Sequence, residues 1–178
     1  MKLFEYQGKE LFKKYGIRVP NFVLLEKPLP RRQAGAGEIS LQFPVVLKSQ
    51  VLSGARKKKG GIKIVEQKED FSEKLEELFV REIDGELPKT ILVEEKVNFE
   101  KEWYLSISYD TDRRMPVLAI SEKGGTEIQT ANIFPLEFVS DAWTLPSRDF
   151  SSQVRQAIES LLELFQKITG EKPVMWGS

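Results

Sequence analysis

Apolar side chains recur at helical spacing in three segments of the chain. A helix that packs on a core shows such a one-sided apolar stripe, because residues three and four positions apart share a face. The pattern therefore predicts three helices: a short N-terminal one over residues 4–15, a second over 71–79, and a longer amphipathic one over 154–168.

Residues that begin or end helices lie at the edges of these stripes. Gly16 follows the first stripe and Gly170 follows the third, and glycine commonly ends a helix. Asp70 precedes the second stripe, and Glu73 stands where the partner of a capping box would be. We expect Asp70 to open that helix through such a box.

Six other segments have the pattern of β-strands, either as a short apolar run or as strict alternation of apolar and polar residues. The predicted strands cover residues 21–25, 43–47, 62–65, 90–93, 103–109 and 116–120. A polar turn over 110–114 joins the last two as a hairpin. Mixed strands and helices without a sequence repeat predict an α+β fold, with a lobe boundary in the charged segment 94–102.

The three tryptophans lie in different contexts. Trp103 begins an alternating segment and is assigned to a strand that faces the core. Trp143 and Trp176 fall in segments with no helix or strand pattern, so we expect both in loops and assign them no role.

The charges of the chain balance, because 27 Lys and Arg residues face 27 Asp and Glu residues. A global field that would gather nucleic acid or a membrane surface is therefore not expected. The chain has no cysteine and no histidine, which excludes thiol chemistry, a Ser-His-Asp triad and a histidine-based zinc site. With no signal peptide and no membrane span in the pattern, we expect a cytoplasmic or organelle-matrix protein.

Positive charge is concentrated in one place, directly after the predicted strand 43–47. Lys48 follows that strand, and Gly54 and Ala55 leave the backbone accessible ahead of Arg56 and Lys57. Backbone N–H groups combined with cations form a cradle for phosphate. No Walker GxxxxGK[ST] motif is present. The alternatives from the residues alone are a solvated hairpin turn, since charge runs are usually hydrated, and a nucleic-acid patch, which the neutral net charge disfavours.

A second set of residues lies between two predicted strands. Glu94 and Glu95 end one strand, and Glu102 opens the next. A strand–linker–strand hinge exposes backbone groups that can read a purine edge, and a carboxylate such as Glu102 can accept hydrogen bonds from ribose hydroxyls. Solvated acidic strand ends are the alternative. Combined with the basic segment, the two sets describe a nucleotide site.

Four stretches of the chain keep the order and spacing of one known family. They are MKLFEYQGKELFKKYGIRVP, VVLKSQVLSGARKKKGGIKIV, ILVEEKVNFEKEWYLSISYD and SEKGGTEI. Together they resemble the β subunits of succinyl-CoA synthetase and their relatives, the acyl-CoA synthetases that form a nucleoside diphosphate. The resemblance implies an ATP-grasp fold, with a small lobe at residues 21–95 and an incomplete large lobe at 1–20 and 96–178.

The resemblance also implies roles for individual residues. Lys48 and the loop at Ala55, Arg56 and Lys57 would bind the nucleotide phosphates. The side chain of Glu94 and the backbone of Val97 would lie near the base, and Glu102 would lie near the ribose. The chain departs from the family pattern where Ala55 and Lys57 replace glycines and where Leu52 replaces a residue that is often histidine.

The resemblance implies an acid–CoA ligase in which ATP or GTP with Mg²⁺ exchanges phosphate with a histidine on a partner α subunit. A chain without histidine is compatible with that division of labour. The family's metal ligands come from later E-N-P-L and D-G-K stretches, and neither these nor the C-terminal CoA-binding domain is in this sequence. Activity of this chain alone is therefore not expected. The alternative is a non-catalytic interaction module, or one half of a split ATP-grasp protein, that docks on a missing half or on a second copy of itself.

Overall fold

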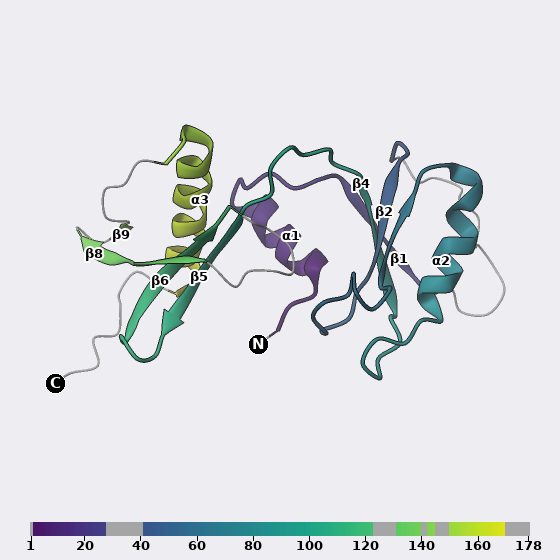
Figure 1. The fold of residues 1–178 in the computed structure, drawn as a ribbon, viewed down its shortest axis with the longest axis horizontal. Helices are drawn as coiled ribbons and strands as arrows, with labels where there is room; N and C mark the ends of the chain where they lie inside the picture. The colour runs from purple at the N-terminus through teal and green to yellow at the C-terminus, as the bar shows by residue number, and fades with distance from the viewer. Residues whose placement is uncertain (1, 28–40, 123–130, 140–141, 145–149, 170–178) are drawn as a thin grey trace. The chain divides into compact units, whose positions relative to one another are not determined.

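The chain folds into two units, which are seen in a computed structural model (Figure 1). The first comprises residues 1–13 and 18–98, and the second comprises residues 14–17 and 99–178. The structure describes residues 2–27, 41–122, 131–139, 142–144 and 150–169. None of the helices in these ranges is long and apolar enough to cross a membrane.

A four-stranded antiparallel sheet forms the centre of the first unit. Its strands are β1 (Phe22–Glu26), β2 (Val45–Ser49), β3 (Ile62–Val65) and β4 (Thr90–Glu95), in the spatial order β1-β4-β2-β3. The register of β2 and β4 puts Val46 opposite Glu94 and Lys48 opposite Leu92. Since side chains alternate along a strand, Lys48 and Glu94 lie on the same face as near neighbours.

One face of this sheet packs against α2 (Phe71–Phe79), which a 3-10 turn over Lys68–Asp70 precedes. The strands contribute alternate apolar residues to this face, and α2 contributes its apolar stripe. The buried core consists of Leu41, Val45, Leu47, Val65, Phe71, Leu78, Phe79, Ile91 and Val93. Burial of this set drives formation of the first unit.

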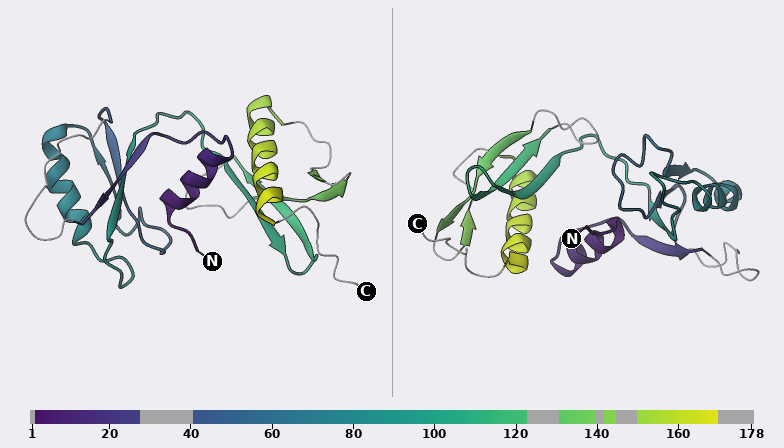
Figure 2. Two further views of the ribbon diagram at one scale, coloured as in Figure 1. Left: turned by 180° about the vertical axis from the view of Figure 1, so that it is seen from behind. Right: turned by 90° about the horizontal axis from the view of Figure 1, so that it is seen from below.

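The N-terminal helix α1 (Glu5–Lys14) lies on the opposite side of the sheet from α2 (Figure 2). Gln7 Oε1 accepts a hydrogen bond of 3.0 Å from the backbone N–H of Phe4, which satisfies a donor at the start of the helix. The helix ends before Gly16, whose φ of +77° is the left-handed conformation that glycine adopts at helix ends. None of its residues is fully buried.

The second unit is built on a three-stranded antiparallel sheet of β5 (Tyr104–Asp110), β6 (Met115–Ser121) and β7 (Asn132–Pro135), in that order. The hairpin of β8 (Glu137–Val139) and β9 (Ala142–Thr144) and the helix α3 (Ser152–Thr169) complete it. Its buried core consists of Leu118, Ile120, Leu136, Val154 and Ile158.

The predicted elements agree with this architecture, so the α+β prediction is confirmed. All three predicted helices and all six predicted strands are present, with shifts of one or two residues at their ends. One shift matters for the site. Strand β2 runs from Val45 to Ser49, so Lys48 is a member of the strand and not the first residue after it.

Two predictions about local structure are wrong. Asp70 makes no side-chain cap hydrogen bond, and its φ of −80° and ψ of −8° are already helical, because the 3-10 turn begins the helix earlier. Trp143 lies in β9 and not in a loop. Its ring contacts Phe138 and Phe165 with centroid distances of 5.1 and 6.2 Å.

Other predictions can be compared with the structure only in part. Trp103 packs against the second core beside the start of β5, as expected for a core residue. Trp176 and most of the SEKGGTEI stretch lie outside the described residues. The short strands β7, β8 and β9 were not predicted, because segments of three or four residues carry too few positions to show a period.

Candidate functional site

A cluster of five charged side chains lies on the face of the first sheet that α1 covers. It is called the charge cluster below, and its members are Glu5, Lys9, Lys48, Arg56 and Glu94. The strands β2 and β4 supply Lys48 and Glu94, and α1 supplies Glu5 and Lys9. Tertiary folding thus brings together residues that are far apart in the sequence.

Lys48 is at the centre of the cluster. Its Nζ lies 2.9 Å from Glu5 Oε1 and also forms an ion pair with Glu94 Oε1. The side chain of Lys48 is 19% exposed and that of Glu94 is 7% exposed. A charge with so little solvent contact requires a partner, because desolvation of an unpaired ion is costly.

The second oxygen of Glu94 is held by α1. Lys9 Nζ lies 2.7 Å from Glu94 Oε2 and 3.7 Å from Glu5 Oε1. Glu5 and Lys9 are four positions apart, so they share one face of the helix. The buried carboxylate of Glu94 therefore lies between two ammonium groups, one from the neighbouring strand and one from the helix.

Arg56 joins the basic segment to the cluster. Its Nη2 donates to Glu5 Oε2 at 2.6 Å, and its Nη1 donates to the backbone carbonyl of Ser49 at 2.8 Å. The guanidinium is thus turned toward α1 and the end of β2. These charge-assisted hydrogen bonds fix both the side chain and the loop that carries it.

The pKa values of two members reflect this pairing. Burial raises the pKa of the Glu5 carboxyl, but Lys48 and Arg56 outweigh it and hold that pKa below its ordinary value. Burial lowers the pKa of the Lys48 ammonium, but Glu5 and Glu94 outweigh it and raise that pKa above its ordinary value. Both side chains are therefore charged at neutral pH.

Residues 52–60, called the basic loop below, connect β2 to β3. The loop closes through the backbone N–H of Gly61, which donates to the carbonyl of Arg56 at 2.8 Å. The four consecutive N–H groups of Gly54, Ala55, Arg56 and Lys57 donate to no acceptor among the described residues. A row of unpaired amides beside cations is the arrangement that binds anions.

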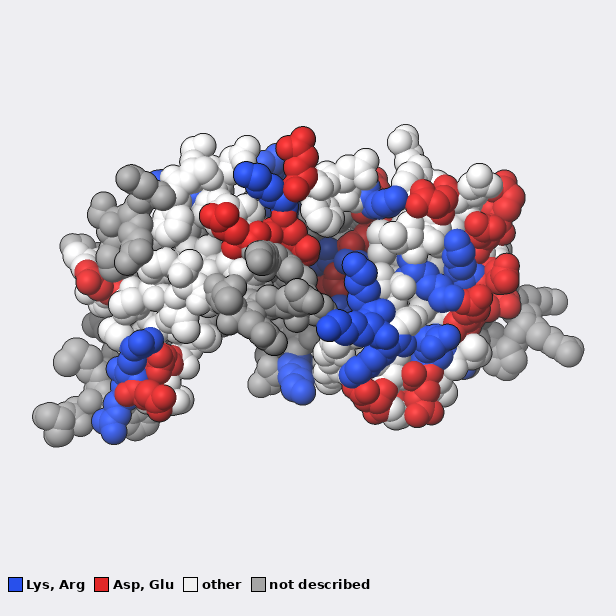
Figure 3. Space-filling view, in the orientation of Figure 1, with Lys and Arg blue, Asp and Glu red and all other residues white. Residues whose placement is uncertain are grey.

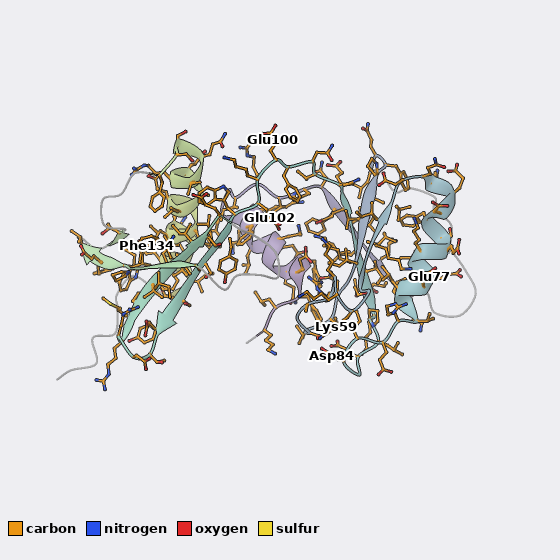
Figure 4. All side chains as sticks on the ribbon, in the orientation of Figure 1. Lys59, Glu77, Asp84, Glu100, Glu102 and Phe134 are labelled. Atoms are coloured by element: carbon orange, nitrogen blue, oxygen red, sulfur yellow. The ribbon has the colours of Figure 1, made fainter. Side chains whose placement is uncertain are left out.

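The basic loop is anchored to the turn at residues 83–86 (Figure 4). Lys59 Nζ lies 2.5 Å from Asp84 Oδ2, and Ser53 Oγ also donates to this oxygen. Leu52 N donates to Glu86 Oε2 at 3.4 Å. Beneath these contacts the buried side chain of Ile83 packs against Gly61. The loop therefore has a defined position on the first unit.

The surface of this unit carries a group of Lys and Arg side chains bordered by acidic ones (Figure 3). Within the basic loop, Lys57 and Lys58 are exposed and have no charged partner among the described residues, whereas Lys59 pairs with Asp84. The basic loop therefore presents the unpaired charges of Lys57 and Lys58 to solvent, whereas the charge of Lys59 is paired.

The structure brings three of the predicted site residues together, namely Lys48, Arg56 and Glu94. Gly54, Ala55 and Lys57 lie exposed in the basic loop. Val97 follows β4 in the first unit and is 52% exposed. Glu102 is exposed in the second unit (Figure 4). The ligand roles assigned to these eight residues remain predictions.

Sequence reasoning gave no role to three residues at the site. Glu5 and Lys9 complete the ion pairs, and Gln50 connects α1 to β2, accepting from Tyr6 N at 3.2 Å and donating to Lys48 O at 3.0 Å. Glu5 and Lys9 belong to the N-terminal stretch that carries the family resemblance, and their spacing puts them on one helix face. This spacing could not indicate which strand that face would meet.

The second unit contains an open cleft of about 860 Å³ between its sheet and the start of α3. Trp103, Phe134 and Phe150 line it together with charged residues such as Glu100 and Lys101. Figure 4 labels Phe134 and Glu100. None of the eight predicted site residues lines this cleft. Among the described residues, no group of three or more acidic side chains could hold a metal ion.

Comparison with protein families and with known proteins found several matches to this chain. Residues 2–171 match the model of the ATP-grasp domain. The succinate–CoA ligase [ADP-forming] β subunit of Methanocaldococcus jannaschii is 46% identical over 129 residues, which are 72% of this chain and 34% of that protein. The ADP-forming sulfoacetate–CoA ligase subunit SqwK of Acholeplasma sp. is 38% identical over 73% of this chain and 31% of that protein. The chain therefore spans about a third of the length of these relatives.

Solved structures support the same fold. ATP citrate lyase from Methanothrix soehngenii matches 93% of this chain and 44% of its own, with a TM-score of 0.65 and 20% identity. D-alanine–D-alanine ligase from Helicobacter pylori matches 94% of this chain and 44% of its own, with a TM-score of 0.55 and 17% identity. The predicted ATP-grasp fold and the predicted family resemblance are thus confirmed.

Proposed function

Since this chain belongs to the ATP-grasp domain family, we propose that it forms the nucleotide-binding part of an acid–CoA ligase β subunit. The basic loop would hold the phosphates of ATP or GTP, and Lys48 would supply the charge closest to them. The observation that carries the proposal is the row of four unpaired N–H groups from Gly54 to Lys57, beside the guanidinium of Arg56.

The chemistry of the loop fits phosphate better than the alternatives. Consecutive unpaired amides beside a guanidinium offer several hydrogen-bond donors, which suits the several oxygens of a phosphate chain. A hydrated solubility turn would not need its base anchored by Lys59, Asp84 and a buried Ile83. The anchored position favours a ligand-binding role.

Lys48 and Glu94 have complementary parts in this proposal. Lys48 retains 19% exposure, so its ammonium can reach a ligand, whereas Glu94 is 7% exposed and engaged by two lysines. Glu94 would therefore act near the base mainly by holding Lys48 in place. Loss of the Lys48 charge is expected to cost about 1.5–3 kcal/mol of binding free energy.

The base and sugar would be read by the segment after β4. Val97 lies beyond the strand ladder, and its backbone groups make no backbone hydrogen bond within the described residues. They are available to the edge of a purine. Glu102 is exposed and its carboxylate could accept from ribose hydroxyls.

In the complete enzyme, the nucleotide would phosphorylate a histidine on an α subunit, and the phosphate would then activate a carboxylic acid for transfer to CoA. This chain has no histidine, so the acceptor would come from the partner. No group of three or more acidic side chains that could hold a metal ion lies together among the described residues, and the Mg²⁺ that accompanies the nucleotide would be held by residues outside this part of the enzyme. The names of the relatives favour succinate or a similar acid.

Isothermal titration of the purified chain with ADP, ATP and GDP tests the proposal. We expect binding by the wild type and at least a tenfold weaker affinity in Lys48→Met, which keeps the length of the side chain but removes its charge. Lys63→Met is the matched control, because Lys63 lies on the adjacent strand and pairs with Glu77.

Two outcomes would contradict the proposal. One is the absence of binding at millimolar nucleotide in a chain that circular dichroism shows to be folded. The other is equal loss of affinity in Lys48→Met and Lys63→Met, which would indicate a general effect on folding and not a phosphate contact.

A further inference from the structure

Glu5 occupies the two cations that the proposed function assigns to phosphate. Its Oε1 lies 2.9 Å from Lys48 Nζ, and its Oε2 lies 2.6 Å from Arg56 Nη2. One carboxylate thus bridges an ammonium and a guanidinium with one oxygen each. A phosphate group bound between the same two cations would use its oxygens in the same way.

We propose that Glu5 is an internal counter-anion of the nucleotide site, which competes with the phosphates for Lys48 and Arg56 and so lowers the affinity for nucleotide. This inference rests on the function proposed above and deepens it. It names the residue of the chain that sets how tightly the phosphates are held.

The charge balance of the cluster supports this role. Among the described residues, three cations, Lys9, Lys48 and Arg56, pair with two carboxylates, those of Glu5 and Glu94. The cluster therefore has a net charge of about +1 at neutral pH, which is small for a site that binds a polyphosphate. Without the charge of Glu5, the net charge would be about +2, and attraction for an anion would rise accordingly.

Glu5 and Glu94 are not equivalent. Glu94 lies deeper, is 7% exposed and is paired with Lys9 as well as Lys48. Glu5 is 21% exposed and borders a hollow of about 350 Å³, which Lys2, Leu3, Leu52, Gly54 and Arg56 also line. An anion in this hollow would lie beside both Glu5 and Arg56. Glu5 is therefore the carboxylate that a ligand would displace.

The backbone of α1 at Glu5 is held in place without the Glu5 side chain. Gln50 holds the backbone of Tyr6 to β2, so the first turn of the helix is fixed independently of the Glu5 side chain. Neutralising Glu5 should thus change the electrostatics of the site while α1 stays in place.

The experiment compares the affinities of the wild type and Glu5→Gln for ADP, for inorganic tripolyphosphate and for adenosine, by isothermal titration without metal. We expect Glu5→Gln to bind ADP and tripolyphosphate about tenfold more tightly than the wild type does, because a competing negative charge is removed. Binding of adenosine should not change, because adenosine has no phosphate. The gain should shrink at high salt.

Glu10→Gln is the matched control, since Glu10 is on the same helix, is exposed and has no charged partner among the described residues. It should leave all three affinities unchanged. Glu5→Ser is a second neutral variant, used if Glu5→Gln does not fold, and it should show the same gain.

The outcomes separate this inference from the function on which it rests. Unchanged or weaker binding of both phosphate ligands by the folded neutral variant overturns the inference, as does an equal gain for adenosine, which would indicate a change of shape. If the folded wild type binds no nucleotide, the proposed function is contradicted, and the inference fails with it. If Lys48→Met weakens ADP binding while Glu5→Gln has no effect, the proposed function stands and only the counter-anion role fails.

Discussion

Lys48 on β2 and Glu94 on β4 form an ion pair across two adjacent strands, on the face of the sheet opposite the apolar core. The pair is largely shielded from water, since the two side chains are 19% and 7% exposed. Removal of one partner leaves the other charge with less compensation in a poorly solvated place.

The first prediction concerns this pair. Lys48→Met should lower the free energy of unfolding by roughly 2–4 kcal/mol, because Glu94 then keeps Lys9 as its one charged partner among the described residues. The double variant Lys48→Met/Glu94→Gln should recover part of that loss, since both charges are gone. Urea denaturation of the wild type, both single variants and the double variant measures the coupling. Strict additivity would show that the two residues do not interact.

The second prediction concerns acid stability. The pKa of Glu5 is below its ordinary value of 4.5, so the charged carboxylate makes its full contribution to the free energy of unfolding above pH 4.5. This contribution is lost as the pH falls from 4.5 through the lowered pKa of the folded state. Glu5→Gln should therefore show a shallower loss of melting temperature in this acid range, whereas Glu10→Gln should follow the wild type. Identical melting temperatures of the wild type and Glu5→Gln relative to their neutral-pH values throughout the acid range would contradict the pairing of Glu5 with Lys48 and Arg56.

The alkaline range provides the complementary prediction. The pKa of Lys48 is above its ordinary value of 10.5, so the charged ammonium makes its full contribution to the free energy of unfolding below pH 10.5. This contribution is lost as the pH rises from 10.5 through the raised pKa of the folded state. Lys48→Met should remove this part of the alkaline destabilisation, while Lys63→Met serves as the comparison. Melting temperatures recorded from pH 9 to 12 decide the question.

The fourth prediction concerns the loop backbone. Ala55 has a φ of +54°, a left-handed conformation in which a Cβ costs about 1 kcal/mol. Ala55→Gly should therefore stabilise the chain by roughly 0.5–1 kcal/mol. The control is Ala157→Gly at an exposed position inside α3, which should lower the free energy of unfolding by about 1 kcal/mol. Urea denaturation measures the change in the free energy of unfolding for both variants. A loss of stability in both would contradict the strain at Ala55.

The fifth prediction concerns the end of the basic loop. A Cβ at Gly61 would lie 2.5 Å from Ile83 Cδ1 and 3.3 Å from the Arg56 carbonyl. Since Ile83 is 1% exposed and cannot easily move, Gly61→Ala should cost about 1–3 kcal/mol of stability. A Cβ at Gly54 meets nothing within 4 Å, so Gly54→Ala is the control and should have little effect. Thermal unfolding of the two variants compares them directly.

The elements with a clear period were predictable from the sequence alone. The stripes of α1, α2 and α3 fit only the helical period, and the short apolar, β-branched runs of β2 and β4 are typical of buried strands. Burial of these apolar residues then stabilises the elements. The local composition of the basic loop likewise predicts an anion site, and that role remains a prediction.

Tertiary structure decided which charges meet. The sequence places Glu5, Lys48 and Glu94 more than forty positions apart from one another, and no local rule connects them. The antiparallel register of β2 and β4 brings Lys48 beside Glu94, and packing of α1 adds Glu5 and Lys9. Periodicity is a local property of the chain, whereas the pairing of charges depends on long-range strand order and helix packing. The sequence therefore determined the elements and the basic loop, and the fold decided that the cations of that loop are already partly neutralised.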